Sequence, residues 1–131
     1  MSDQPIETTI APWLAVSDGA KALEFYMAAL GAVDAYCLDG DDQEALVAQL
    51  RVGGAAFWIS ADRASSPKPV DKGSVRMILT VSDPDALFER AITAGATEVA
   101  PVHEEHGWRT GRVTDPFGHD WEFGRPLATG D

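Results

Sequence analysis

The segment His103-Glu104-Glu105-His106 gathers four side chains that can bind a metal ion or move a proton. Imidazole nitrogens and carboxylate oxygens are common ligands of divalent ions, and a histidine beside a substrate can act as a general acid or base. We place these residues in a loop, 103–110, whose shape the sequence does not give, so this spacing does not define a site. We interpret the segment as part of a solvated acidic loop, and we keep a metal site built from His103, His106 and Glu122 as the alternative.

The other residues that could do chemistry stand apart from one another. His119 and Glu122 are three positions apart, which places them on opposite faces of a strand. The single cysteine, Cys37, has no histidine or asparagine signature around it, so we interpret it as a small buried side chain rather than a nucleophile. The pair Gly53-Gly54 is typical of a hairpin turn. Phosphate-binding loops, nucleophile elbows and Cys/His metal motifs are absent from the sequence.

Composition limits the partners that this chain can have. Its 131 residues fit one compact domain, and 21 acidic against 10 basic residues give a net charge of −11. Such a surface repels phosphate backbones and anionic lipid, so we expect no nucleic-acid partner and no membrane partner. The first residues lack the basic and apolar regions of a signal peptide, and no apolar run approaches the roughly 20 residues that span a bilayer. With its lone cysteine, the chain is expected to be cytoplasmic.

An internal repeat organises the sequence. Residues 14–32 read LAVSDGAKALEFYMAALGA, and residues 79–96 read LTVSDPDALFERAITAGA. The motif Val-Ser-Asp returns after 65 residues, and each copy ends in Gly-Ala. About half the chain separates the copies, which indicates two copies of one supersecondary unit rather than a solenoid. We assign module one to residues 8–63, a linker to 64–73 and module two to 74–126, within a single domain of residues 1–131.

Each copy predicts a strand, a helix and three further strands. Asp18 and Asp83 can cap the first helical amides, and Gly31 and Gly95 supply the residue that commonly closes a helix. Turn-forming residues separate the strands, among them 39–42 and the Asp-Pro-Phe-Gly turn at 115–118. The predicted strands of the two copies are residues 9–16, 33–38, 45–52, 55–60, 75–81, 97–102, 111–114 and 120–123. Each half is therefore βαβββ.

From residue 12 to residue 123 the chain resembles the vicinal oxygen chelate superfamily, which includes glyoxalase I, bleomycin- and fosfomycin-resistance proteins and extradiol dioxygenases. The resemblance is most specific at residues 14–32 and in Gly-Arg-Val followed by Asp-Pro-Phe-Gly-His, residues 111–119. It is closest to the glyoxalase-like and bleomycin-resistance-like branch. The resemblance implies an α+β fold of two tandem βαβββ modules that form a curved mixed sheet around a pocket, in a homodimer.

Catalytic members of this superfamily bind a divalent metal through four side chains, from the first and last strand of each module. Matching their positions to this sequence gives Ala11, Trp58, Arg76 and Glu122. Alanine and tryptophan offer no metal-binding atom, and arginine is permanently cationic. One carboxylate does not make a tight site for zinc or iron. We therefore expect neither a metal nor another cofactor.

The same resemblance places Arg76 and Glu122 on neighbouring strands facing the pocket. A guanidinium and a carboxylate there can pair directly and replace the metal structurally. In a second interpretation Arg76 binds an anionic group of a ligand and Glu122 orients it. Both interpretations remain open.

Three tryptophans complete the predicted site. Strand alternation places Trp13 on the side of Ala11, and Trp58 should face the same side. The resemblance implies that Trp108, in the loop 103–110, lies near the pocket mouth. Together they would stack on a small aromatic or cationic ligand, although Trp13 and Trp58 could equally belong to the core or a dimer interface. Trp121 is expected in the core. We therefore predict a metal-free small-molecule-binding protein. The alternative is a metal-dependent lyase, isomerase or dioxygenase with non-standard ligands.

Overall fold

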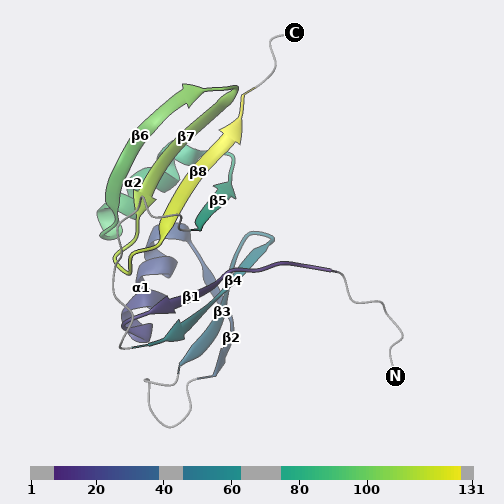
Figure 1. Cartoon of the computed structure of the whole chain (residues 1–131), viewed down its shortest axis with the longest axis vertical. Helices are drawn as coiled ribbons and strands as arrows, with labels where there is room; N and C mark the ends of the chain where they lie inside the picture. Colours follow the sequence, from purple (N-terminus) through teal and green to yellow (C-terminus); the bar gives the residue numbers. More distant parts are fainter. Residues whose placement is uncertain (1–7, 39–45, 63–74, 128–131) are drawn as a thin grey trace.

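The computed structural model describes residues 8–38, 46–62 and 75–127, which form two successive βαβββ modules (Figure 1). Module one consists of β1 (Trp13–Val16), α1 (Gly19–Leu30), β2 (Val33–Leu38), β3 (Val47–Val52) and β4 (Ala55–Ala61). Module two consists of β5 (Arg76–Thr80), α2 (Pro84–Ala94), β6 (Thr97–Glu105), β7 (Trp108–Thr114) and β8 (Asp120–Pro126). The duplicated α+β architecture is confirmed. The predicted linker 64–73 and turn 39–42 lie outside the described residues.

Each module builds its own four-stranded sheet. The strand orders are β1-β4-β3-β2 and β5-β8-β7-β6, and in each sheet only the first pair is parallel. The two helices pack against each other and lie on one side of the sheets, while the opposite side of each sheet carries no helix (Figure 1). We call this second side the helix-free face. Within the described residues, neither helix is long and apolar enough to cross a membrane.

The helix boundaries follow the predicted caps. Asp18 accepts a hydrogen bond from the backbone N–H of Lys21 at 3.1 Å, and Asp83 accepts one from Ala86 at the same distance. These carboxylates satisfy amides that have no partner within the helix. Gly31 ends α1 with a φ of 68°, in the left-handed region that glycine adopts at little cost. Local sequence chemistry therefore sets where these helices begin and end.

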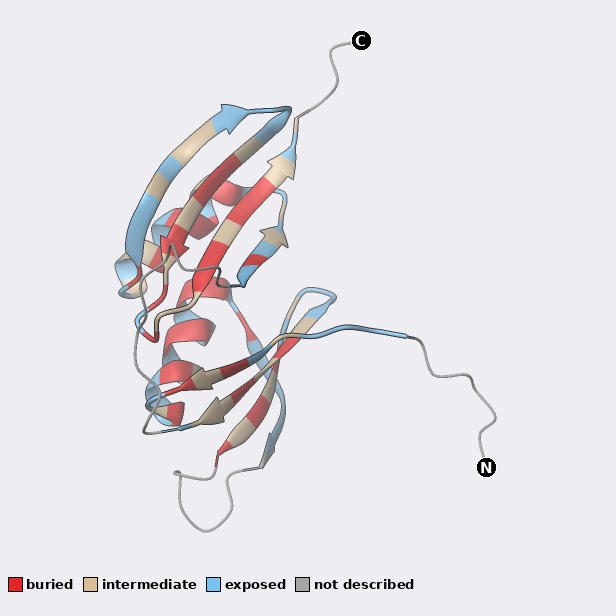
Figure 2. Cartoon of the chain, viewed as in Figure 1, coloured by how far each residue is buried: buried red, intermediate tan, exposed pale blue. Residues whose placement is uncertain are grey.

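Buried and accessible side chains alternate along β1 and β4, and Trp121 and Phe123 of β8 are buried, so that one face of each sheet joins a common core with the helices (Figure 2). Trp121 belongs to this core at 4% exposure, as predicted, and packs edge-on against Phe57 of module one with ring centroids 5.3 Å apart. The largest fully buried side chains come from both modules: Tyr26, Phe123, Leu50, Ile59, Val16, Val113 and Pro84. The modules therefore share one core.

A buried carboxylate joins the modules. The hydroxyl of Tyr26 in α1 donates to Asp115 Oδ2, which also accepts from Trp121 Nε1 at 2.9 Å. Asp115 Oδ1 accepts from the backbone N–H groups of Phe117 at 2.8 Å and His119 at 3.0 Å. Burial, and then the charge of Asp115, raise the pKa of Tyr26 well above 10.0, so the phenol stays neutral and remains a donor.

The segment that the sequence predicts as the loop 103–110 is a β-hairpin, so that expectation was wrong. Glu105 faces Trp108 across a two-residue turn, in which His106 and Gly107 have φ angles of 54° and 80°. Positive φ at both central residues is typical of a type I′ turn, whose twist suits a hairpin. Because β6 is an edge strand, it tolerates the run of charged residues that obscured its alternation in the sequence.

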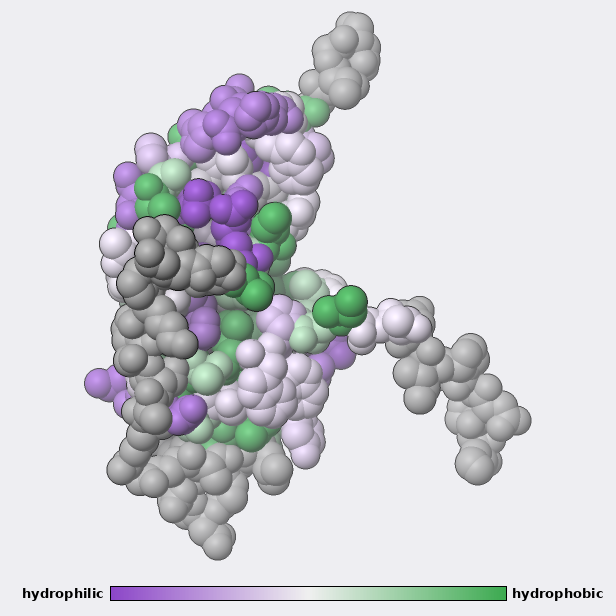
Figure 3. Space-filling model, in the orientation of Figure 1, coloured by the Kyte–Doolittle hydropathy of each residue, from purple (hydrophilic) through white to green (hydrophobic). Residues whose placement is uncertain are grey.

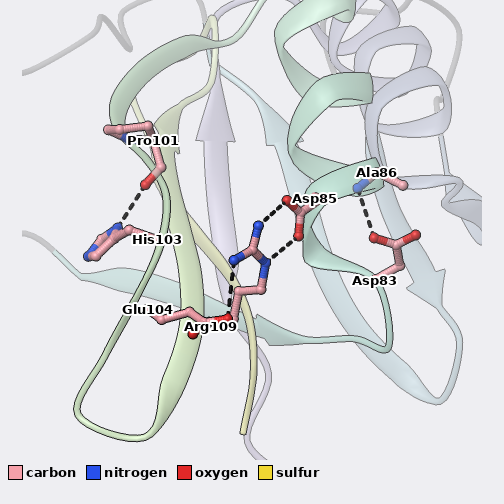
Figure 4. A network of polar contacts seen from close by, with 7 residues as sticks. All are labelled: Asp83, Asp85, Ala86, Pro101, His103, Glu104 and Arg109. Carbon is pink, nitrogen blue, oxygen red and sulfur yellow. Dashed lines mark hydrogen bonds and ion pairs between the residues drawn. The ribbon is translucent and has the colours of Figure 1, made fainter. Parts of the chain in front are cut away.

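A bidentate ion pair anchors this hairpin to α2 (Figure 4). Arg109 of β7 donates from Nε to Asp85 Oδ1 at 2.7 Å and from Nη2 to Asp85 Oδ2 at 2.6 Å, and its Nη1 reaches Glu104 at 3.3 Å. The hydrogen bonds from Arg109 lower the pKa of Asp85, and those to Asp85 raise the pKa of Arg109. Both side chains are partly exposed, so the contact mainly fixes the orientation of the hairpin.

Candidate functional site

Trp13 and Trp58 lie side by side on the helix-free face of module one. β1 and β4 run parallel with these residues in register, and the rings stack with centroids 6.0 Å apart and planes 20° from parallel. The indole Nε1 of Trp13 donates to Ser60 Oγ at 3.0 Å, which holds the ring in place. Trp13 is nevertheless 58% exposed, so it is not a core residue. The structure thus presents a fixed and accessible aromatic surface.

A third ring, which the sequence did not single out, extends this surface. Tyr36 of β2 packs edge-on against Trp58 with centroids 6.1 Å apart and planes at 68°. A bulge between Asp34 and Tyr36 shifts the register, so that Tyr36 faces Gln49 on the helix-free face rather than a core position. Strand alternation alone would not have found it. Tyr36 is 53% exposed, and we call Trp13, Trp58 and Tyr36 the aromatic cluster.

The predicted ion pair forms on the helix-free face of module two. Arg76 Nε lies 3.1 Å from Glu122 Oε1, and the hydroxyl of Thr110 donates to Glu122 Oε2 at 2.9 Å. The Glu122 side chain is only 19% exposed, whereas that of Arg76 is 41% exposed. Both oxygens of this carboxylate are therefore engaged by the chain itself. The sequence did not single out Thr110, which faces this carboxylate only because β7 and β8 pair in this register.

Trp108 occupies a different part of the molecule. It begins β7, pairs with Glu105 and Pro126, and is 39% exposed. Among the described residues it forms no ring contact with Trp13 or Trp58, which lie together in the other module. The start of β7 is at the end of the module two sheet that points away from module one (Figure 1). Within one chain the structure therefore brings together two of the three predicted tryptophans.

The positions that correspond to the superfamily's metal ligands do not fit a divalent ion. Trp58 is stacked in the aromatic cluster, Arg76 adds a positive charge, and Glu122 already accepts from Arg76 and Thr110. Ala11, just ahead of β1, offers no ligand atom. In residues 8–38, 46–62 and 75–127, no three His, Cys, Asp or Glu side chains cluster closely enough to hold a metal ion.

The alternative ligands do not converge either. His103 leaves the hairpin on the side opposite to Arg109 (Figure 4), its Nδ1 lies 2.8 Å from the carbonyl oxygen of Pro101, and its Nε2 lies 3.3 Å from Glu105 Oε1. The Pro101 carbonyl first, and then Glu105, raise the pKa of His103 above 6.5, because both stabilise the protonated ring. His106 lies at the hairpin turn, among residues exposed to solvent.

Two further residues differ from their expected settings. Cys37 lies exposed on β2 rather than buried, so its interpretation as a core residue was wrong. His119 follows the Asp-Pro-Phe-Gly turn as predicted, but its Nε2 also lies 2.8 Å from the carbonyl oxygen of Ala15 in β1. This contact connects the turn of module two to the first strand of module one.

The two helix-free faces differ in chemistry. Module one carries aromatic rings, whereas hydrophilic side chains gather over the middle of the module two sheet, with apolar side chains along its β5 border (Figure 3). The duplicated βαβββ architecture is that of the vicinal oxygen chelate superfamily. Within it, the chain belongs to the glyoxalase-like domain family, whose sequence profile matches residues 12–123.

Relatives and solved structures support this assignment. An uncharacterized protein of Mycobacterium tuberculosis strain H37Rv is 36% identical over 130 residues, covering 93% of this chain and 76% of that protein. The crystal structure of TioX from Micromonospora sp. ML1 has a TM-score of 0.72 at 27% identity, covering 92% and 100% of the two chains. A glyoxylase/bleomycin resistance protein/dioxygenase domain from Frankia sp. EAN1pec shares the fold, with a TM-score of 0.77 at 17% identity and 96% coverage of both chains.

Proposed function

We propose that this protein is a cytoplasmic binding protein that holds a small aromatic or cationic compound on the aromatic cluster, without a metal ion at the four superfamily positions. The stacked pair formed by Trp13, which is exposed, and Trp58, which is half-buried, carries the proposal. A tryptophan normally buries most of its large ring, so two neighbouring rings that remain accessible indicate an interaction surface. A binding role also accounts for the hydrogen bond from Trp13 to Ser60, because this bond fixes a ring that lies outside the core.

The geometry suits flat or positively charged guests. Three strands hold the three rings, so little side-chain entropy is lost when a ligand stacks on them. Each favourable ring contact contributes about 0.5–1.5 kcal/mol, and a cation over a ring face about 0.5–2 kcal/mol. The net charge of −11 attracts a cationic guest to the protein.

A binding experiment with matched probes tests this function. We expect 1-methylquinolinium, an aromatic cation, to quench tryptophan fluorescence saturably, and tetramethylammonium, a cation without a ring, to bind more weakly. Trp13→Ala and Trp58→Ala should each weaken the binding of 1-methylquinolinium by about threefold or more. Trp108→Ala is the matched control from the other module, and it should leave binding unchanged. Equal binding by wild type and both cluster variants would contradict the proposal, as would a stoichiometric metal in the purified protein.

We further propose that the protein forms a homodimer in which a second copy covers the edges of the two sheets. β1 and β5 are both edge strands, and exposed apolar side chains lie on them or just ahead of them, at places 65 residues apart. Ile10 and Val75 lie just ahead of the two strands, at 98% and 77% exposure, and Ile78 lies within β5 at 59%. Apolar side chains repeated along two unpaired strand edges favour burial against another chain.

The oligomeric state of the protein in solution tests the proposed homodimer directly. We expect light scattering coupled to size-exclusion chromatography to give a dimer for the wild type and a monomer for Ile78→Glu. Met27→Glu is the matched control, because Met27 is an exposed apolar residue on α1, away from both edges. A wild-type monomer at micromolar concentration, or a dimer that survives Ile78→Glu, would rule out this arrangement.

A further inference from the structure

Arg112 stands out on the helix-free face of module two. It lies in β7 directly opposite Glu122 of β8, and it is half-buried. Its Nε is buried and has no hydrogen-bond partner among the described residues. Buried nitrogen donors in proteins are nearly always paired, and a donor of a charged group costs most when it is not. Arg112 therefore lacks an acceptor that its surroundings should provide.

The nearby carboxylates do not supply that acceptor. Glu122 Oε1 is taken by Arg76 and its Oε2 by Thr110, at 3.1 Å and 2.9 Å. Asp120, the other acidic residue of β8 on this face, accepts from Thr114 Oγ1 at 3.0 Å and is 6% exposed. Both acidic side chains therefore accept from other donors, and neither forms a hydrogen bond with the Nε of Arg112.

On the opposite face of β7, the guanidinium of Arg109 is paired with a carboxylate. Arg109 holds both oxygens of Asp85 side-on through Nε and Nη2, at 2.7 Å and 2.6 Å. Planar carboxylates match this edge of the guanidinium, because two parallel hydrogen bonds form at once. Arg112 has the same edge. Its Nε is shielded from solvent while the side chain as a whole is half-buried, and no acidic side chain of the described structure pairs with this edge as Asp85 does with Arg109.

We propose that Arg112 binds the carboxylate group of a small-molecule ligand on the helix-free face of module two. Arg76 and Thr110 engage the oxygens of Glu122, and Glu122 forms no hydrogen bond with the Nε of Arg112. Glu122 and Asp120 repel a dianion more strongly than a monoanion, which favours a carboxylate over a phosphate. This site does not depend on the aromatic cluster, because the residues that form it belong to the other sheet.

Side-chain NMR of the full chain tests the site at the atom concerned. In ¹H–¹⁵N spectra, the Nε–Hε signal of Arg112 is assigned by its absence in Arg112→Lys. Benzoate is the probe, benzamide is its uncharged match, and sodium chloride at equal ionic strength controls for screening. We expect benzoate to shift this signal saturably, whereas benzamide and sodium chloride do not.

Two variants complete the test. Arg112→Gln should weaken benzoate binding by about tenfold or more, because it removes a charge-assisted bidentate contact. Arg112→Lys should weaken it less, because the charge remains while the planar fork is lost. Arg51→Gln, which removes an exposed arginine from module one, should leave binding unchanged. A signal that does not respond to benzoate, or that responds equally to sodium chloride, would overturn the proposal. Benzoate affinity that survives Arg112→Gln in a folded protein would also overturn it.

Discussion

Replacing Tyr26 with phenylalanine removes one hydroxyl from the buried contact that joins the two modules. The ring of Tyr26 is fully buried and its shape is kept by phenylalanine, so only the hydrogen bond to Asp115 is lost. Asp115 retains three donors, from Trp121, Phe117 and His119, and is not left unpaired. A hydrogen bond to a charged group contributes about 1.5–3 kcal/mol. We therefore expect a loss of about 2 kcal/mol in the free energy of unfolding.

Urea denaturation at pH 7 measures this loss, and it should lower the midpoint without changing the slope. In thermal unfolding, the same loss corresponds to roughly 6–8 °C for a domain of this size. Tyr36→Phe is the matched control, because Tyr36 is 53% exposed and its hydroxyl is not in the core. Its stability should stay within about 0.5 kcal/mol of the wild type.

Alkaline pH provides a second readout of the same hydroxyl. The pKa of Tyr26 is raised in the folded protein, so its contribution is fully present below 10.0, the pKa of an unperturbed phenol, and is lost as the pH rises above that value. The stability difference between the wild type and Tyr26→Phe should therefore shrink above pH 10.0. If Tyr26→Phe loses no more stability at pH 7 than Tyr36→Phe does, the contact between Tyr26 and Asp115 does not hold the modules together.

Three further perturbations follow from other contacts. Gly111→Ala should cost about 1–3 kcal/mol in urea denaturation, because its new Cβ would lie 2.8 Å from a side-chain atom of β6; an unchanged midpoint would contradict this packing. Asp85→Asn should lower the melting temperature at pH 7, and the deficit should vanish as the pH falls below 3.8, because Arg109 lowers the pKa of Asp85 and this stabilisation is lost on protonation. Glu105→Gln should lower the pKa of His103 in an NMR titration but leave it above 6.5; a fall below that value would show that its backbone contact is not the main cause.

Much of the fold could be predicted because its signals are local. Asp18 and Asp83 cap their helices through amides three residues away, and Gly31 ends α1 at the predicted position. The repeat of Val-Ser-Asp after 65 residues predicted two modules, and the sheets confirm them. The hairpin at residues 105–108 was missed because charged residues on an edge strand hide its alternation.

The candidate site was predictable only in part. Resemblance to the superfamily placed Arg76 beside Glu122, and their ion pair confirms that placement. Tyr36 was missed because a bulge, which leaves no mark in the sequence, moves it to the helix-free face. Arg112 was missed because its Nε is notable only for having no hydrogen-bond acceptor among the described residues. The residues beside it on the next strand depend on the register of β7 and β8, which the sequence does not give.

With the resemblance to the superfamily, the sequence implied that Ala11, Trp58 and Arg76 fit a metal ion poorly. By itself it determined the duplicated βαβββ order and the ends of the helices. These properties depend on residue types and on spacings of a few positions. Only the tertiary structure decided that Trp58 stacks with Trp13 and Tyr36 while Trp108 lies in the other module. The physical reason is strand pairing: a shift of one residue in register moves a side chain from one face of a sheet to the other.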